Sequence, residues 1–241
     1  MESMTAHPSV ARLDRLIGIA PGLALAAAAA LTGVLRRDKP LHPVGHIGTG
    51  RLTLSTSVPD LGVPALADGG TRSCVVRWSR AMGLPRGWPD IEGLALRLPG
   101  ASQHGDDADL LLASTGEHRW SRYLLTLRPP RRFGRLTTLL PVRAGGRALT
   151  FALDPVTGGA DGLPPTSYVL EVARGTGPWQ GLGRLDVAWS EGDTPDRFDP
   201  VARPLDGVEQ YAFVEALREP AYVAARAVAR ARPTTEKRPH A

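Results

Sequence analysis

Between residues 48 and 191 the chain carries short apolar segments, five to eight residues long, separated by glycine, proline and aspartate. In the last of them Leu185, Val187 and Trp189 alternate with polar residues, which is the period of a strand with one buried face. Eight such segments joined by turn residues favour an antiparallel sheet or barrel, and the lack of strand–helix–strand alternation disfavours a doubly wound α/β fold. The segments are RLTLST (51–56), CVVRWS (74–79), LALRL (94–98), DLLLAS (109–114), RYLLTLR (122–128), RALTFAL (147–153), SYVLEVA (167–173) and GRLDVAWS (183–190).

The composition is that of a globular protein with one sizeable core. A chain of 241 residues that is 42% hydrophobic and 22% charged can bury a sizeable core and is not of the disordered type. Cys74 is the single cysteine, which excludes an internal disulfide and cysteine-rich zinc sites and favours a reducing, cytoplasmic location. The net charge of +5 comes mainly from arginines, with aspartate and glutamate scattered among them. Without a basic run interleaved with aromatic residues, nucleic acid is not an expected partner.

The two ends of the chain differ from the middle. Residues 16–35 are uncharged and long enough to cross a bilayer, but alanine is weakly apolar and a proline and a glycine interrupt them. A buried or interface-lying helix is the first interpretation, and a membrane anchor is the alternative. After residue 207 the strand pattern stops, and two helical pieces meet near Pro220. The expected organisation is an N-terminal Ala-rich helical segment (1–38), a β-barrel domain with C-terminal helices (39–232) and a disordered tail (233–241).

Common catalytic motifs are missing from the sequence. It contains no G-x-S-x-G, Walker or H-E-x-x-H motif, and no G-x-G-x-x-G that opens a helix. His42 and His46 have a spacing that could bind a metal on a helix, but Pro43, Gly45 and Gly48 prevent a regular helix there. A metal-dependent hydrolase is therefore not expected, because the remaining histidines are scattered.

Four motifs carry more information together than separately. His42 stands before a strand and is followed by glycines at plus three and plus eight, and Arg77 interrupts an apolar strand. Arg218 and Tyr222 form an R-x-x-x-Y pair on the expected last helix. In chain order, the motifs are LHPVGHIGTGRLTL (41–54), VVRWS (75–79), DIEGLALRL (90–98) with DLLLAS (109–114), and R-x-x-x-Y (218–222).

In this order and spacing, the motifs resemble those of the haem catalases and the smaller catalase-related peroxidases. Those proteins carry H-x-x-G, V-R-F-S, D-x-R-G-F-A-V-K-F and D-L-V-G-N-N at the barrel, and R-x-x-x-Y on a C-terminal helix. The resemblance covers residues 39–114 and 198–226. It implies a mainly β (α+β) fold, an antiparallel barrel of the catalase type with an N-terminal helix and C-terminal helices. The implied cofactor is haem b with its iron.

The resemblance assigns a role to each matching residue. His42 matches the distal histidine that moves a proton between the two oxygens of peroxide. Arg77 matches an arginine that pairs with a haem propionate, a task that suits the bidentate guanidinium fork. Tyr222 matches the axial iron ligand, and Arg218 is the nearby cation that favours its phenolate form.

The sequence departs from the family pattern in the peroxide pocket. Ala113 stands where catalases have the distal asparagine, and Ser114 is the nearest side chain that could donate a hydrogen bond instead. Lys39 replaces an arginine before the distal histidine. We therefore expect a peroxidase with weak catalase activity, which uses peroxide to oxidise a small organic substrate.

Simpler interpretations remain for each residue. His42 can be a turn residue, Arg77 an outward side chain of an alternating strand, and Arg218 with Tyr222 a stabilising pair on a basic helix face. The alternative function is a degenerate catalase-like barrel that acts as a non-enzymatic binding or membrane-associated protein, with residues 16–35 as the membrane contact. A homodimer is also left open.

Overall fold

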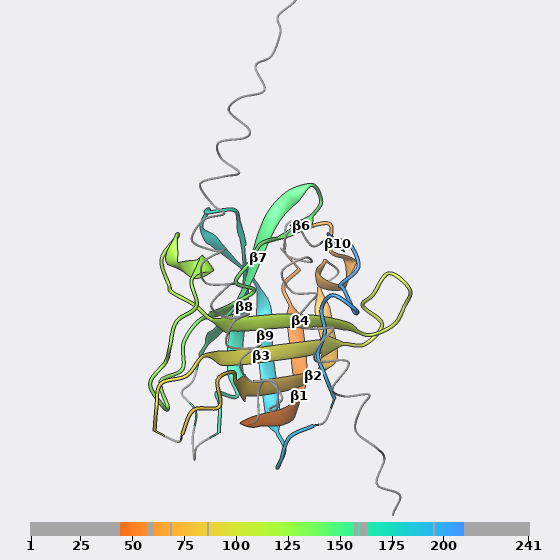
Figure 1. The fold of residues 1–241 in the computed structure, drawn as a ribbon. Coiled ribbons are helices and arrows are strands. Elements are labelled where there is room, and N and C mark those ends of the chain that lie inside the picture. Colours follow the sequence, from red (N-terminus) through yellow and green to blue (C-terminus); the bar gives the residue numbers. More distant parts are fainter. Residues whose placement is uncertain are drawn as a thin grey trace, which may run out of the picture. The chain divides into compact units, whose positions relative to one another are not determined.

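The structure is a computed structural model that describes residues 44–56, 60–67, 69–85, 87–156, 159, 163–194 and 196–209. These residues form ten strands and two short 3₁₀ helices (Figure 1). The strands are β1 (Val44–Leu54), β2 (Gly70–Arg80), β3 (Glu92–Leu98), β4 (Ala108–Ser114), β5 (Leu136–Thr137), β6 (Val142–Ala144), β7 (Arg147–Pro155), β8 (Ser167–Arg174), β9 (Trp179–Trp189) and β10 (Val208–Glu209). The 3₁₀ helices are η1 (Pro64–Leu66) and η2 (Ser121–Tyr123).

Eight of the strands close into an antiparallel barrel. Around it the order is β1, β2, β3, β4, β5, β7, β8 and β9, and β9 pairs with β1 to complete the circle. β6 pairs with the first half of β7, and β10 extends β6. The antiparallel barrel that the alternating segments predict is confirmed.

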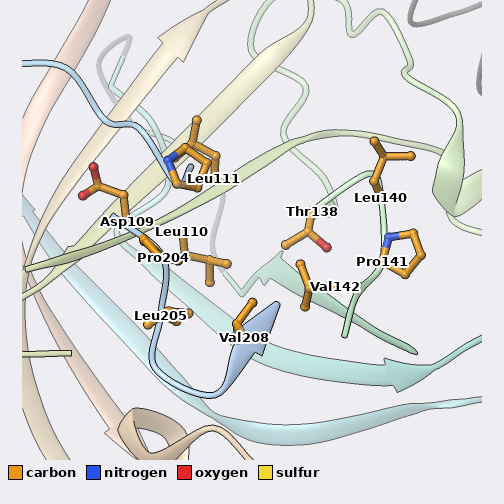
Figure 2. A pocket seen from close by; sticks show the side chains of 11 residues that line it. Asp109, Leu110, Leu111, Thr138, Leu140, Pro141, Val142, Pro204, Leu205 and Val208 are labelled. Carbon is orange, nitrogen blue, oxygen red and sulfur yellow. The ribbon is translucent and has the colours of Figure 1, made fainter. Parts of the chain in front are cut away.

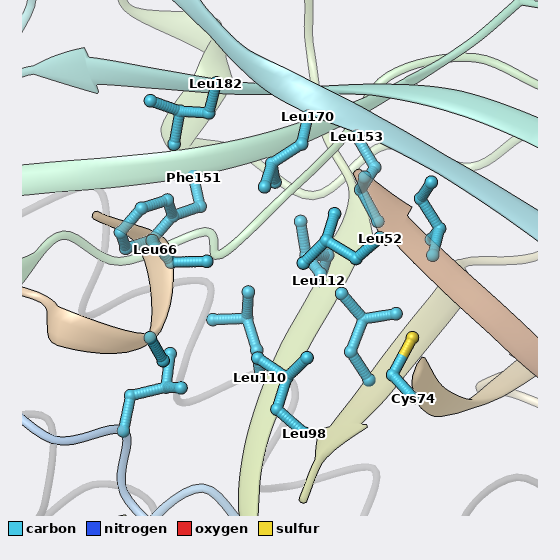
Figure 3. Close-up of a cluster of buried hydrophobic side chains, with 14 of the residues drawn as sticks. Leu52, Leu66, Cys74, Leu98, Leu110, Leu112, Phe151, Leu153, Leu170 and Leu182 are labelled. Carbon is cyan, nitrogen blue, oxygen red and sulfur yellow. The ribbon is translucent and has the colours of Figure 1, made fainter. Parts of the chain in front are cut away.

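Apolar side chains fill the inside of this barrel. Every second residue of a strand points inward, and these inward residues are mostly leucine. Figure 3 shows them meeting in the interior, and each fully buried leucine stabilises the fold by roughly 1.5–3 kcal/mol. Because the interior is packed, a binding site has to lie on the outer face or at an end. The labelled core residues are Leu52, Leu66, Cys74, Leu98, Leu110, Leu112, Phe151, Leu153, Leu170 and Leu182.

One predicted strand is wrong. Residues 122–128 form the end of η2 and two isolated bridges, and the two-residue strand β5 stands between β4 and β7 instead. Leu124 is 39% exposed and Leu127 56% exposed, so this segment has no continuous apolar face to bury in a sheet. Pro129, which follows, also lacks the N–H that would extend a ladder.

The predicted terminal segments lie outside the described residues. This applies to the Ala-rich segment 1–38, to the C-terminal helices and to the tail 233–241, so both predicted domain boundaries stay predictions. Within the described ranges, the helices are too short to span a bilayer.

Candidate functional site

Arg77 lies on the outer face of the barrel. Along β2, Cys74, Val76 and Trp78 are buried and point inward, so Val75 and Arg77 point outward. The register of β1 to β4 places Arg77 among two adjacent outward rows, which we call the outer patch. Its residues are Ile47, Arg77, Ala95 and Leu111 in one row and Gly45, Ser79, Gly93 and Ala113 in the other.

Small side chains dominate the outer patch. Five of its eight positions are glycine, alanine or serine, so few long side chains project from this part of the sheet. Ala113 belongs to the patch and offers it no hydrogen-bond donor. The side chain of Leu111 gives the patch an apolar border next to the pocket of Figure 2.

A bidentate ion pair between Arg77 and Asp193 crosses one edge of the outer patch. Arg77 donates from Nε to Oδ1 of Asp193 at 2.7 Å and from Nη2 to Oδ2 at 2.6 Å. Asp193 follows β9, whereas Arg77 is on β2, so the guanidinium passes over the intervening strand β1. A Cβ on Gly45 would lie 2.9 Å from Nη2 of Arg77 and 2.8 Å from Oδ2 of Asp193. The ion pair therefore requires glycine at position 45.

The ion pair also sets the charge of Asp193. Its burial raises the pKa, but hydrogen bonds from Arg77 and from the Thr194 amide outweigh that effect and hold the pKa below its usual value. The carboxylate is thus ionised at neutral pH, and it occupies the edge of the guanidinium that a ligand carboxylate would use. Sequence reasoning identified Arg77 but missed Asp193, because no local motif links residues so far apart.

A second ion pair ties the end of the described chain to the barrel beside the outer patch. Arg97 and Asp109 face each other across β3 and β4 and are joined by hydrogen bonds of 2.8 and 3.0 Å. Arg97 also donates to the carbonyl of Arg197, and Asp109 accepts from the amide of Asp199. The guanidinium of Arg97 lies 4.5 Å from the ring centroid of Phe198. Residues 196–209 are thereby held against the outer face of β3 and β4.

An apolar pocket lies where this segment meets the sheet. Figure 2 shows side chains of β4, of the β5–β6 region and of the C-terminal segment around it. It is continuous with the outer patch through Leu111. Its lining residues are Asp109, Leu110, Leu111, Thr138, Leu140, Pro141, Val142, Pro200, Pro204, Leu205 and Val208.

Ser114 is on the other face of β4. It is fully buried, donates to the carbonyl of Thr126 at 2.7 Å and accepts from the amide of Glu92 at 3.1 Å. Its hydroxyl therefore joins the loop after η2 to the start of β3. The structure does not bring Ser114 together with Arg77.

The other predicted site residues, His42, Arg218 and Tyr222, lie outside the described residues. His46 is described, and its ring centroid is 5.9 Å from that of Trp78. Across the described ranges, His, Cys, Asp and Glu side chains form no group of three that could hold a metal ion.

A buried polar cluster that the sequence did not reveal surrounds Glu92, at the start of β3. Burial raises the pKa of Glu92 to about 7, although Arg128 and Arg80 attract its charged form. The Nε atom of Arg128 is 3.8 Å from the Glu92 carboxylate. This group titrates near neutral pH, but it faces away from the outer patch.

Comparison with known proteins gives a fold but no family. No family model matches the chain, and no curated protein matches it. A fungal catalase is 12% identical over 80% of this chain and 60% of its own, with a TM-score of 0.55. Catalase A from Saccharomyces cerevisiae is 10% identical over 80% of this chain and 62% of its own, with a TM-score of 0.54. The chain thus spans about three-fifths of these two catalases, and the likeness shows a catalase-like fold.

The outer patch carries part of the chemistry that a flat ring with acidic side groups would need. Its small side chains at positions 93, 95 and 113 and the apolar Leu111 suit a planar group, while Asp193 and Arg77 cover Gly45. Arg77 supplies a cation at the patch edge, with a fork that matches a carboxylate. Haem, with its planar macrocycle and two propionates, has this chemistry.

Proposed function

We propose that this protein is a haem-dependent oxidoreductase that uses peroxide to oxidise a small organic substrate and has weak catalase activity. The observation that carries the proposal is the outer patch, which combines small side chains with Arg77 at its edge on a catalase-like barrel. A packed barrel interior leaves this outer face as the place for a large planar cofactor.

Three residues would hold the cofactor. Arg77 pairs with a propionate, in competition with Asp193. Tyr222 would offer its phenolate oxygen to the iron, and Arg218, one helical turn earlier in the expected helix, would favour the charged form of that phenol. When bound, haem supplies an iron centre that accepts oxidising equivalents from peroxide.

The protein's part in the reaction is to move a proton. The imidazole of His42 would take a proton from one peroxide oxygen and return it to the other, so that the second oxygen could leave as water. Ala113 has no donor with which to orient peroxide. Release of oxygen from a second peroxide is therefore slow, and the oxidation of an organic substrate is the main outcome.

Reconstitution with haem followed by stopped-flow mixing with peroxide tests this function. His42→Ala should keep its haem but react about 10²- to 10⁴-fold more slowly with peroxide, because it lacks the general base. His104→Ala, changed in an exposed loop, is the matched control and should react like the wild type. A His42→Ala protein that reacts as fast as the wild type would overturn the proposed mechanism.

One observation favours a second function, a catalase-like barrel that binds ligands without catalysis. Asp193 already satisfies the fork of Arg77 with two short hydrogen bonds. Together with the lack of a side-chain donor at Ala113, this pairing favours a barrel that does not hold haem. A full chain that takes up no haem when haem is supplied would support this function over the enzyme.

A further inference from the structure

The segment around η2 covers the outer face of β7, β8 and β9, away from the outer patch. Tyr123 donates its hydroxyl to the carbonyl of Gly175 at 2.7 Å, and Arg119 donates from Nε to the carbonyl of Thr176 at 3.1 Å. The hydroxyl of Thr137 donates to the carbonyl of Arg122 at 3.0 Å. These bonds fasten the segment to β5 and to the β8–β9 hairpin, and they enclose a layer of side chains between the segment and the sheet.

Arg122 is the central residue of this layer. It is only 2% exposed, and its Nε and Nη1 atoms find no hydrogen-bond acceptor among the described residues. Its guanidinium lies 4.3 Å from the ring centroid of Trp179, and that of Arg135 lies 5.0 Å from the same ring. Burial and the neighbouring positive charges of Arg135 and Arg119 lower the pKa of Arg122. Arginine nevertheless keeps its proton, so a charge remains buried here.

The nearby carboxylates bond to Arg135 and not to Arg122. Asp154 and Glu171 both accept hydrogen bonds of 2.7 Å from Nη2 of Arg135. A buried charge without a counter-charge or hydrogen bonds is strongly unfavourable, and native proteins rarely contain one. Asp154 and Glu171 thus match Arg122 and Arg135 in number, but both bond to Arg135, so the described residues leave Nε and Nη1 of Arg122 without an acceptor.

Two further donors are unpaired in the same layer. Thr150, Ala173 and Trp179 are directly opposite one another in the register of β7, β8 and β9, so they share the sheet face on which Trp179 contacts Arg122 of η2. The hydroxyl of Thr150 and the indole Nε1 of Trp179 are buried, and the described part of the chain offers neither a partner. The unsatisfied groups of Arg122, Thr150 and Trp179 can all donate, which is the chemistry of an anion site and not of a cation site.

We propose that the layer between η2 and strands β7 to β9 binds a small inorganic anion of about the size of chloride. Arg122 supplies the charge, and the Trp179 indole and the Thr150 hydroxyl donate hydrogen bonds. Arg122 is almost fully covered, which favours a monatomic ion over a larger oxyanion. The bound anion stabilises the attachment of the η2 segment to the barrel, and this site is independent of haem.

Thermal unfolding of the full chain without haem, in sodium chloride against sodium gluconate at constant ionic strength, tests the site. Chloride should raise the Tm of the wild type along a saturating curve. Trp179→Phe keeps the aromatic ring but lacks the N–H, and Thr150→Val keeps the shape but lacks the hydroxyl. Each should need about tenfold more chloride for half-saturation, as expected for one lost hydrogen bond to an anion. Trp88→Phe, at a tryptophan that is 61% exposed, should behave like the wild type.

Crystals grown in bromide provide a second readout, because an anomalous peak beside the Arg122 guanidinium is expected. The proposal is overturned if chloride and gluconate give the same Tm, or if both layer variants respond to chloride as the wild type does. It is also overturned if the crystals show an ordered water in place of bromide, because the unpaired donors would then be satisfied without an anion.

Discussion

The guanidinium of Arg77 reaches across Gly45 of β1 and meets both carboxylate oxygens of Asp193, at 2.6 and 2.7 Å. This relationship joins β2 to the segment after β9 over a strand that lies between them. At the edge of the outer patch, a ligand carboxylate therefore has to compete with Asp193 for Arg77. It binds there only if it displaces Asp193 or shares the guanidinium with it.

The first prediction concerns this competition. Asp193→Asn removes the negative charge that holds the fork of Arg77, so haem should bind severalfold more tightly to this variant. Arg77→Gln should bind haem more weakly than the wild type does. Arg184→Gln, which breaks a half-exposed pair with Asp186, is the control and should leave the affinity unchanged. Quenching of tryptophan fluorescence by added haem measures all four proteins, and equal affinities of Arg77→Gln and the wild type would exclude the propionate role.

The second prediction concerns the anchor of the C-terminal segment. Asp109→Asn leaves the Arg97 guanidinium buried without its carboxylate, which should cost about 3–5 kcal/mol in the free energy of unfolding. The control is Asp186→Asn, where the ion pair is about half exposed and the change should stay below about 1 kcal/mol. Urea denaturation measures both. Similar losses in the two variants would show that the buried pair does not anchor the segment.

The third prediction concerns the pH dependence of stability. Because burial raises the pKa of Glu92 to about 7 in the folded state, the folded protein binds a proton there that the unfolded chain releases near its ordinary pKa of 4.5. The contribution of this proton is present below about pH 4.5, declines as the pH rises and is lost above about pH 7. The free energy of unfolding of Glu92→Gln, measured relative to that of the wild type, should therefore rise by about 3 kcal/mol from pH 4.5 to pH 8. Denaturant titrations at both pH values check this, and a constant difference would contradict it.

The fourth prediction concerns the packing between β1 and β2. A Cβ on Gly50 would lie 2.6 Å from Sγ of Cys74 and 2.6 Å from Cγ2 of Val76, so Gly50→Ala should destabilise the fold by about 1–3 kcal/mol. Gly181→Ala is the matched control on β9, where a Cβ would have nothing within 4 Å. Burial raises the pKa of Cys74 to about 11, so its thiol should resist alkylation until the barrel unfolds. The measurement is the urea concentration at which Cys74 becomes alkylated. This concentration should be lower for Gly50→Ala than for Gly181→Ala.

The barrel was predictable because its inward faces follow a simple rule. In β9, Leu185 and Val187 alternate with Arg184 and Asp186, and that period of two is visible without a structure. The segment around η2 was misjudged because Leu124 and Leu127 are apolar in composition but exposed in position. The apolar content of a segment alone does not predict which face of a strand, or which element, will be buried.

The faces of β4 were harder to assign. The segment DLLLAS has leucines on both faces, because residues 196–209 cover the outer face while the core covers the inner one. Sequence reasoning therefore could not decide whether Ala113 or Ser114 faces the same surface as Arg77. The register with β3 decides it, with Ala113 outward and Ser114 inward. The partner of Arg77 was equally hidden, since Asp193 becomes its neighbour only when β9 closes the barrel against β1.

Haem binding through Tyr222 underlies the proposed function, and a titration with haem can distinguish it from binding elsewhere. The full chain is titrated with haem and followed by its absorption spectrum, together with Tyr222→Phe and the control Tyr211→Phe from the same C-terminal segment. The wild type and Tyr211→Phe should bind one haem per chain with identical charge-transfer bands, and Tyr222→Phe should lose those bands and most of its affinity. If Tyr222→Phe binds haem with the same affinity and the same spectrum as the wild type, Tyr222 is not the ligand and the proposed haem site is wrong.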